Sequence, residues 1–448
     1  MSKKTTVDSF SSSVETLKVI SNDKTKNVEL AGQGFSAFYY HESILSDTIK
    51  ATVQYVETGN SVDGKNIIEG LPLVGTEKVE IKFSDAAGEK IGVTPKLELY
   101  VNKVTPLSSD TRKELVQLDL VSKEFELNEK VRLRKRYDGK ISDHIKTILT
   151  DTIGEGLGTE KNIEIEDTAN NFNFIGNNKK SFWTLNWLSK KAVSAENQKL
   201  GKSAGYFFYE TSEGYFFKSI DGLLSQEPKR SIIYNESSDG GDHIPPRYDY
   251  QAFEYEKNNL IEAQKKLMIG AFSTKVVLFD PFKAVYEVVT PNLEETQEQL
   301  KLAGKDLPKL NDELNIPGKD REFSRATYYL LDKGTLPTGD TNQQIEKSDE
   351  ENFEYRSILN QSIMRYNQFL SFTATITIPG DFTLHAGDAI FLDVPLLEEG
   401  DTTEPSAMDS GLYIITDLTH YISSSETLTR LGLVRDSFGR KGKPTGKI

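Results

Sequence analysis

The sequence predicts a mainly β protein of the α+β class, in which two β-barrel domains are related by internal duplication, with an inserted α/β domain and an acidic insertion. Two segments about 300 residues apart indicate the duplication. Residues 118–125 read LDLVSKEF and residues 431–438 read LGLVRDSF, with Leu, Leu, Val and Phe at the same four positions. An apolar run and a Ser-rich turn precede each segment, at 97–110 and at 412–425. Alternation of apolar and polar residues predicts half-buried strands in both copies.

The first barrel domain is expected over residues 14–127, after a disordered N-terminus at 1–13. Apolar and polar side chains alternate along residues 49–55, which is the period of a strand with one face on a core and the other in solvent. A similar strand is expected within residues 71–83. This first domain is therefore predicted to be all-β.

The inserted α/β domain is expected over residues 128–238. It begins with a predicted basic strand, and apolar residues within 141–149 then keep the spacing of an amphipathic helix. A second helix is expected to start with Ser181 as its N-cap. An aromatic hairpin follows at 206–217, with Gly214 able to take a positive φ in the turn.

The second barrel domain is expected in two parts, at residues 239–290 and 353–439. Between them, residues 291–352 carry 14 acidic against 8 basic side chains, which predicts an acidic insertion. The second part begins with a helical pattern and continues into a strand whose one face is apolar and whose other face is hydroxyl-bearing. Residues 440–448 are basic and are expected to form a flexible tail.

Composition narrows the classes of function. The chain has no cysteine, which excludes disulfides, thiolate metal sites and cysteine nucleophiles. Its formal net charge of -14 argues against a protein that grips nucleic acid by neutralising phosphates. We find no signal peptide and no apolar run long enough for a membrane helix, so no membrane anchor is expected.

The histidines give no sign of catalysis or metal binding. They are far apart in sequence and match no metal-ligand spacing, so each is interpreted as a surface or packing residue, with His144 on the exposed flank of a helix. No catalytic residue, metal site or cofactor is predicted. The five positions are His41, His144, His243, His385 and His420.

Two features are candidate interaction sites. The basic side chains Arg132, Arg134 and Arg136 stand out from the acidic background, either as a dock for an acidic partner or as a solvated strand paired with acids of the same chain. The aromatic hairpin is apolar on both faces, so it is expected to be buried either in its own core or against another subunit. Its candidate interface residues are Tyr206, Phe208, Tyr215 and Phe217.

Several stretches together resemble the central baseplate hub of contractile-tailed bacteriophages. HESILSDTIKATVQYVETG at 41–59, followed by LPLVGTEKVEIKF, is similar to the opening of the first tube-like domain of that family. SFWTLNWLSKKAVS at 181–194 and GYFFYETSEGYFFKSIDGLL at 205–224 resemble its middle domain. GAFSTKVVLFDP at 270–281 and the segment at 411–438 resemble its second tube-like domain.

The resemblance implies a structural virion protein with two tail-tube-like domains. It implies a homotrimeric, pseudo-six-fold ring that joins the hexameric tail tube to a trimeric spike and contacts other baseplate (wedge) proteins. DNA would pass through the channel without specific binding, in a virion tail baseplate assembled in the host cytoplasm. Six polar positions would then face the channel or a neighbouring subunit: Lys50, Thr52, Gln54, Thr373, Thr375 and Thr377.

Two alternatives remain open from the sequence. One is a related hub or spike-base protein of a bacterial contractile injection or secretion system, which would need the same geometry. The other is a carbohydrate-binding or carbohydrate-active β protein, for which Trp183 or Trp187 would report sugar binding. The 68 acidic residues offer too many pairs for spacing to pick out a glycosidase site.

Overall fold

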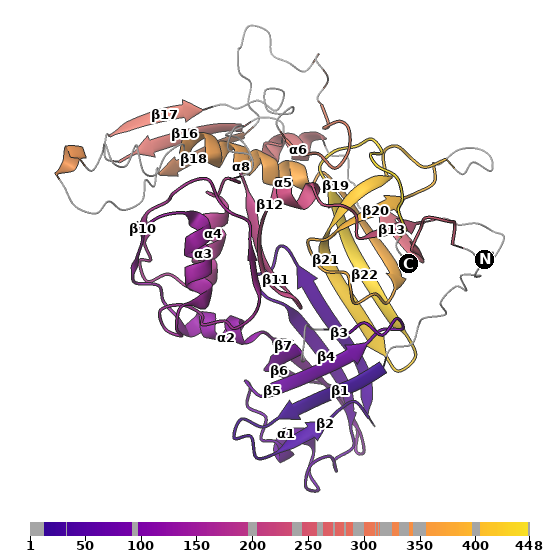
Figure 1. Ribbon diagram of the computed structural model, residues 1–448. Coiled ribbons are helices and arrows are strands. Elements are labelled where there is room, and N and C mark those ends of the chain that lie inside the picture. The colour runs from indigo at the N-terminus through magenta and orange to yellow at the C-terminus, as the bar shows by residue number, and fades with distance from the viewer. Residues whose placement is uncertain are drawn as a thin grey trace.

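The dominant feature of the computed structural model is one 14-stranded sheet that contains strands from both ends of the chain (Figure 1). The structure describes residues 13–32, 34–91, 97–195, 204–234, 244–257, 263–271, 274–281, 284–289, 300–309, 311, 313, 325–330, 340–343, 355–396 and 404–446. The sheet divides into an N-terminal and a C-terminal unit of equal strand number, which pair with each other through β3 and β21.

The N-terminal unit has the strand order β3-β4-β7-β6-β5-β1-β2, with the one-turn helix α1 (Ile67–Gly70) between β4 and β5. Its strands alternate between buried apolar and more exposed side chains, as the period of two predicts. Their bounds are β1 Ser13–Ile20, β2 Asn27–Glu29, β3 Phe35–Ser43, β4 Lys50–Glu57, β5 Lys78–Ser84, β6 Leu97–Ser109 and β7 Glu114–Val121.

The C-terminal unit has the strand order β15-β19-β22-β21-β20-β13-β14. Both units share one apolar core, which runs from Leu17 to Leu433 along the inner faces of the strands. The bounds are β13 Arg230–Ile233, β14 Tyr250–Gln251, β15 Glu254–Lys257, β19 Phe372–Pro379, β20 Ala389–Asp393, β21 Gly411–Ser423 and β22 Thr427–Arg435.

The two units repeat the same strand order, both along the chain and across the sheet. The equivalent strands are β1 and β13, β2 and β14, β3 and β15, β4 and β19, β5 and β20, β6 and β21, and β7 and β22. This confirms the expected internal duplication of two β domains. Within the described residues neither strand order closes on itself, so each unit is an open, curled sheet.

A shared irregularity makes the duplication specific. In the hairpin of β6 and β7, a bulge at Asn102 stands opposite the step from Leu120 to Asp119. In the hairpin of β21 and β22, a bulge at Thr416 stands opposite the step from Leu433 to Gly432. The repeats at 118–125 and 431–438 align Leu120 with Leu433 and Asp119 with Gly432, so both copies have the β-bulge at the same position.

The units differ at their far edge. β1 runs antiparallel to β5, whereas its counterpart β13 runs parallel to β20, and β14 runs parallel to β13. β13 enters from the α/β domain, whereas β1 leads directly into a hairpin with β2. The duplication is therefore closest in the four strands β3, β4, β6 and β7 and their counterparts.

The α/β domain lies between the two units in the chain, and its helices pack beside a short sheet of β11, β12 and β9 (Figure 1). The expected helix at 141–149, the expected hairpin and the positive φ of Gly214 (137°) are all present. Its elements are α2 Lys123–Lys130, β8 Arg136–Tyr137, α3 Ile141–Thr150, β9 Ile163–Ile165, β10 Phe174–Ile175, α4 Ser181–Ser189, β11 Tyr206–Thr211, β12 Gly214–Ser219 and α5 Ile220–Leu224. Ser181 is the first helical residue of α4 rather than its N-cap.

The segment expected to begin the second barrel divides between two sheets. β14 and β15 join the large sheet, but β16 and β17 form a separate sheet with β18. The interruption of the C-terminal unit thus runs from the end of β15 to the start of β19 and includes α6 and α8. The bounds are α6 Ala263–Ile269, β16 Thr274–Asp280, β17 Val285–Val289, β18 Arg325–Leu330 and α8 Tyr355–Phe369. Most of the expected acidic insertion lies outside the described residues.

The chain ends differ from the expectation at one terminus. Residues 1–12 of the expected disordered N-terminus lie outside the described residues, and Ser13 begins β1. At the other end, Arg440 forms an ion pair with Asp393 (2.8 Å), and the backbone N–H of Thr445 donates to Ser231 (3.0 Å). Residues 440–446 are therefore held against β13 and β20, and the expectation of a flexible tail is wrong for them.

Candidate functional site

The feature that unites the molecule is the pairing of β21 with β3, which we call the seam. Seven antiparallel residue pairs join the strands, from Asp417 opposite Ser43 to Ser423 opposite Ala37. The rings of Tyr421 and Tyr39 contact each other across the seam at a tilt of 41°, with centroids 5.1 Å apart. Nδ1 of His41 lies 2.9 Å from Oγ1 of Thr419. The seam makes one continuous surface from two copies of one unit.

The six polar positions predicted from the sequence occupy equivalent places in the two copies. Lys50 stands opposite Val121 and Thr373 opposite Val434, and Val121 and Val434 are equivalent in the repeat. The same registers make Thr52 equivalent to Thr375 and Gln54 to Thr377. Lys50 is exposed, Thr377 is buried, and the other four are partly exposed. That they face a channel or another subunit stays a prediction.

These positions belong to a polar face that crosses both units on the side away from the core. Thr52 donates to Asp119 (3.2 Å) and Gln54 to Gln117 (3.1 Å) in the N-terminal unit. In the C-terminal unit, Thr377 donates to Glu254 (3.0 Å). Because paired residues point to the same side of a sheet, cross-strand hydrogen bonds extend this face from strand to strand.

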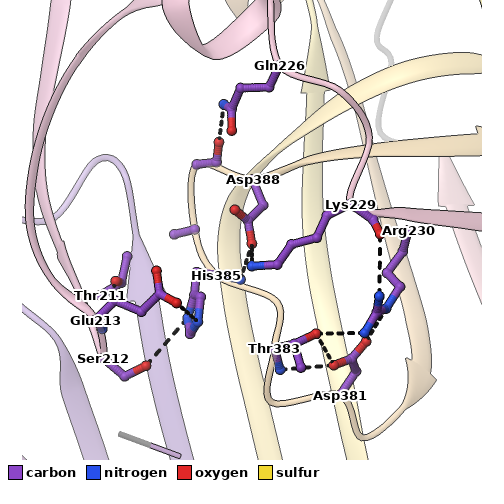
Figure 2. A network of polar contacts seen from close by, with 12 residues as sticks. Thr211, Ser212, Glu213, Gln226, Lys229, Arg230, Asp381, Thr383, His385 and Asp388 are labelled. Atoms are coloured by element: carbon purple, nitrogen blue, oxygen red, sulfur yellow. Dashed lines mark hydrogen bonds and ion pairs between the residues drawn. The ribbon is translucent and has the colours of Figure 1, made fainter. Parts of the chain in front are cut away.

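A buried charge cluster fixes the seam to the α/β domain, and Figure 2 shows its central residue, His385, beside Glu213 and Ser212. His385, in the loop before β20, lies between Glu42 of β3 (Nδ1 to Oε1, 3.3 Å) and Glu213 at the tip of the aromatic hairpin (Nε2 to Oε1, 3.4 Å). Glu42 also accepts hydrogen bonds from Tyr40, Ser212 and Ala386. One imidazole thus contacts carboxylates from two other parts of the fold.

The electrostatics of this cluster favour a charged histidine. Burial lowers the pKa of His385, but the charge of Glu42 and the hydrogen bonds with both carboxylates outweigh it and raise the pKa to about 10. Burial raises the pKa of Glu42, but the charge of His385 and the hydrogen bonds with His385, Ser212 and Tyr40 bring it below its usual range. His385 and Glu42 are therefore a buried ion pair at neutral pH.

Two further ion pairs surround the same loop (Figure 2). Lys229 contacts Asp388 (2.9 Å), and Arg230 contacts Asp381 (2.8 Å). Arg230 also donates to Thr383 (2.9 Å). These contacts tie the segment entering β13 to the loop between β19 and β20, so the whole network stabilises a junction rather than opening to a substrate.

A second buried cluster joins α8 to the end of β22. Arg365 contacts Asp436 (2.7 Å) and Asp221 (3.0 Å), and it donates to the backbone carbonyl of Lys301 (2.5 Å). The Arg365 side chain is only 2% exposed. The sequence did not indicate either cluster, because the residues that form their ion pairs are 71 to 343 residues apart.

The three arginines predicted to form a partner dock make local contacts. Arg132 donates to carbonyl oxygens at the C-terminal end of α2, including that of Glu129 (3.0 Å). Arg134 donates to Asn178 (3.2 Å), and Arg136 pairs with Asp138 (2.7 Å). The expected basic strand is absent, because Lys130 ends α2 and only Arg136 lies in a strand. Partner docking by these residues stays a prediction.

The four candidate interface aromatics are buried inside the chain. Each is at most 2% exposed, and together they pack against α3 and α4 in the core of the α/β domain. The structure therefore selects the first of the two alternatives, a core of the chain itself, over a subunit interface. His144 is likewise buried, with Nε2 2.8 Å from the carbonyl oxygen of Phe172, so its expected exposure is wrong.

Two pockets of the described residues lack the carboxylate pair of a glycosidase. A pocket of about 830 Å³ has three basic and no acidic side chains in its lining. A neighbouring pocket of about 500 Å³ includes the exposed Trp183 and a single carboxylate, Asp47, which accepts from Asn186 (2.5 Å). Neither has the two carboxylates that glycoside hydrolysis ordinarily uses.

Within the described residues, no group of three or more His, Asp or Glu side chains could hold a metal ion. No helix in this part of the chain is long and apolar enough to cross a membrane.

Comparison of the whole fold with solved structures gives matches over nearly the full chain, among them two tail proteins. The tail protein from Neisseria meningitidis MC58 superposes with a TM-score of 0.52 at 9% identity, covering 94% of this chain and 96% of that protein. The 43 kDa tail protein of prophage MuSo2 from Shewanella oneidensis superposes with a TM-score of 0.50 at 10% identity, covering 94% and 98%.

The chain has the fold of phage tail proteins. This confirms the fold that the resemblance to the baseplate hub family implied. No protein-family model matches the sequence, and no curated protein is similar to it. The tail-protein fold is thus conserved in arrangement while about nine residues in ten differ.

Proposed function

We propose that this protein is a structural hub of a phage tail baseplate, without catalytic turnover. Three copies form a ring with six similar units around a channel, one face of the ring meets the tail tube, and the other holds the spike. The observation that carries the proposal is the duplication, which places two equivalent seven-stranded units and one seam in each chain. A chain with two copies of a unit matches a six-fold partner when three chains assemble.

The tail-protein fold supports the same conclusion, since it is shared with two tail proteins over almost their whole lengths. The character of the polar face supports a conduit. Its hydroxyl and amide side chains, such as Thr52, Gln54 and Thr375, offer few positive charges to phosphates. A wall of that kind binds DNA weakly, which suits passage without arrest.

The clusters around His385 and Arg365 also fit a protein that transmits force between a tube and a spike. Buried, mutually paired charges fix the relative positions of the two units and the α/β domain. Such pairs are costly to break one partner at a time. In a hub that connects a tube to a spike, this would keep the two seam-joined units in one orientation.

The proposal is tested by the mass of the purified protein, measured by light scattering alone and after mixing with the tube and spike proteins encoded beside it. We expect a mass of three chains, either alone or in the mixture. Because association depends on concentration, the mass is measured at protein concentrations well above micromolar, so that a weakly associating trimer is also detected. A monomer under every condition would contradict the ring.

A further inference from the structure

The seam inside one chain is a template for a contact between chains. Eight strands run side by side in the order β15-β19-β22-β21-β3-β4-β7-β6. The junction at the middle joins β21 to β3. The strand at one end, β6, is the counterpart of β21, and the strand at the other end, β15, is the counterpart of β3. Among the described strands, each chain therefore has one free edge of each kind that the seam uses.

The free edge of β6 begins where the seam begins in its counterpart. β20 pairs with β21 at Gly411 to Ile414, and β3 takes over from Asp417. In the other unit, β5 pairs with β6 at Leu97 to Tyr100 in the same way. From Lys103 to Ser109, β6 pairs only with β7 among the described strands.

The half of β6 with the free edge is more exposed than the half of β21 that forms the seam. Along the seam, Leu418, His420 and Ile422 are buried. The corresponding half of β6 has no buried residue, and Leu107 is 45% exposed. All four residues of β15 are exposed or partly exposed, whereas its counterpart β3 is half buried. An uncovered strand edge with apolar side chains is a site for pairing with another chain.

An unsatisfied hydroxyl points the same way. Thr419 lies within hydrogen-bonding distance of His41 across the seam. The counterpart of Thr419 is Thr105, whose Oγ1 is buried and has no hydrogen-bond partner within the described residues. Buried polar atoms are normally paired, so within the described residues Thr105 lacks the strand neighbour that Thr419 has in the seam.

We propose that β6 of one copy pairs antiparallel with β15 of the next copy, in the register of the seam. The inference rests on the proposed ring, and it names the surface through which the ring closes. Because the two edges differ, the contact is head-to-tail, which is the kind of interface that generates closed rings. Pro106 lacks an N–H, so it removes one possible bond from this ladder and also discourages pairing in other registers.

The register follows from the repeat. Ser108 stands opposite Leu115, whose counterpart Leu428 stands opposite Tyr421. Glu256 stands opposite Thr375, whose counterpart Thr52 stands opposite Tyr39. Since Tyr421 and Tyr39 face each other in the seam, Ser108 of one copy faces Glu256 of the next.

The test is a disulfide between the two edges, which is clean because the chain has no cysteine. Residues directly opposite in antiparallel strands have Cα atoms about 4.5–5.5 Å apart, within the range of a disulfide. The variant carries Ser108→Cys and Glu256→Cys. The control carries Ser108→Cys and Glu254→Cys, two positions along the same face, where the diagonal distance of about 7–8 Å is too long.

Under mild oxidation we expect most chains of the first variant to form covalent dimers and trimers that a reductant reverses, and only a minor fraction of the control to do so. Trimers by light scattering without this cross-link, or with equal cross-linking in the control, would overturn the strand pairing and leave the ring standing. Monomers under every condition, without cross-linking, would overturn both.

Discussion

A His385→Gln variant is expected to lose about 3–5 kcal/mol of its free energy of unfolding at pH 7, because removal of one partner leaves a buried carboxylate uncompensated. The carboxylate is that of Glu42, whose side chain is fully buried. Urea denaturation followed by circular dichroism measures the effect. As a matched control, His41→Gln removes a half-buried histidine whose hydrogen-bond partner is Thr419 and which has no carboxylate partner among the described residues; it should cost about 1 kcal/mol.

The stability difference between the native protein and His385→Gln is expected to depend on pH. The pKa of His385 is about 10 in the folded chain, above the value of about 6.5 for an unfolded histidine. Its contribution to stability is therefore complete below about pH 6.5 and is lost as the pH rises toward 10. Each pKa unit corresponds to about 1.4 kcal/mol, so the loss amounts to several kcal/mol.

The groups facing His385 set the acid side of this profile. Glu42 and Glu213 have lowered pKa values, so their contributions are lost only as the pH falls below the usual range of a carboxylate. Asp388 has a raised pKa because of burial and acts in the opposite direction. The difference between the native protein and His385→Gln should shrink from pH 7 to pH 10, and a constant difference would contradict the ion pair.

The second large effect is expected at Arg365. An Arg365→Met variant keeps most of the side-chain volume but leaves Asp221 and Asp436 buried without their cation. We expect a loss of about 3–5 kcal/mol in the free energy of unfolding. The exposed Arg134, replaced by Met, is the control and should change it by about 0.5 kcal/mol or less.

A double variant separates charge from packing at this site. If the cost in Arg365→Met comes from the stranded carboxylates, then Asp436→Asn in the same chain should recover part of the stability, because neighbouring changes in one network are not additive. An additive loss would instead show that the arginine acts through packing alone.

Much of the fold follows from local sequence pattern. The strand β19 and the helix α3 lie where their periods of two and of about four residues place them. The repeat at 118–125 and 431–438 identified the two hairpins, because those strands carry the same buried positions and the same bulge. Periodicity is reliable here because each element buries one face against a core.

What sequence pattern missed depends on long-range contacts. β16 has the same alternation as the strands of the large sheet, so the pattern could not assign it to another sheet. His385 was interpreted as a surface or packing residue, because its partner Glu42 is 343 residues away and no local pattern indicates it. α2 was missed because its charged residues lack a strong apolar stripe.

The sequence predicted only part of the candidate site, because local pattern identifies the face of a strand but not its partner strand. Alternation along β4 and β19 identified six polar positions that the registers show to be equivalent. No sequence pattern indicates the free edges of β6 and β15, because whether a strand lies at an edge depends on which strands pair with it. Among the described strands, these edges are recognised only by comparing β6 with β21 and β15 with β3, the strands that pair in the seam.

The central claim is that three copies of this chain make a ring of six similar units. Electron micrographs of the purified oligomer, viewed down its axis and averaged without imposed symmetry, test it most directly. The account predicts a ring with three-fold symmetry, six similar densities and a central opening. Averages with two-fold symmetry, or a closed centre, would contradict it.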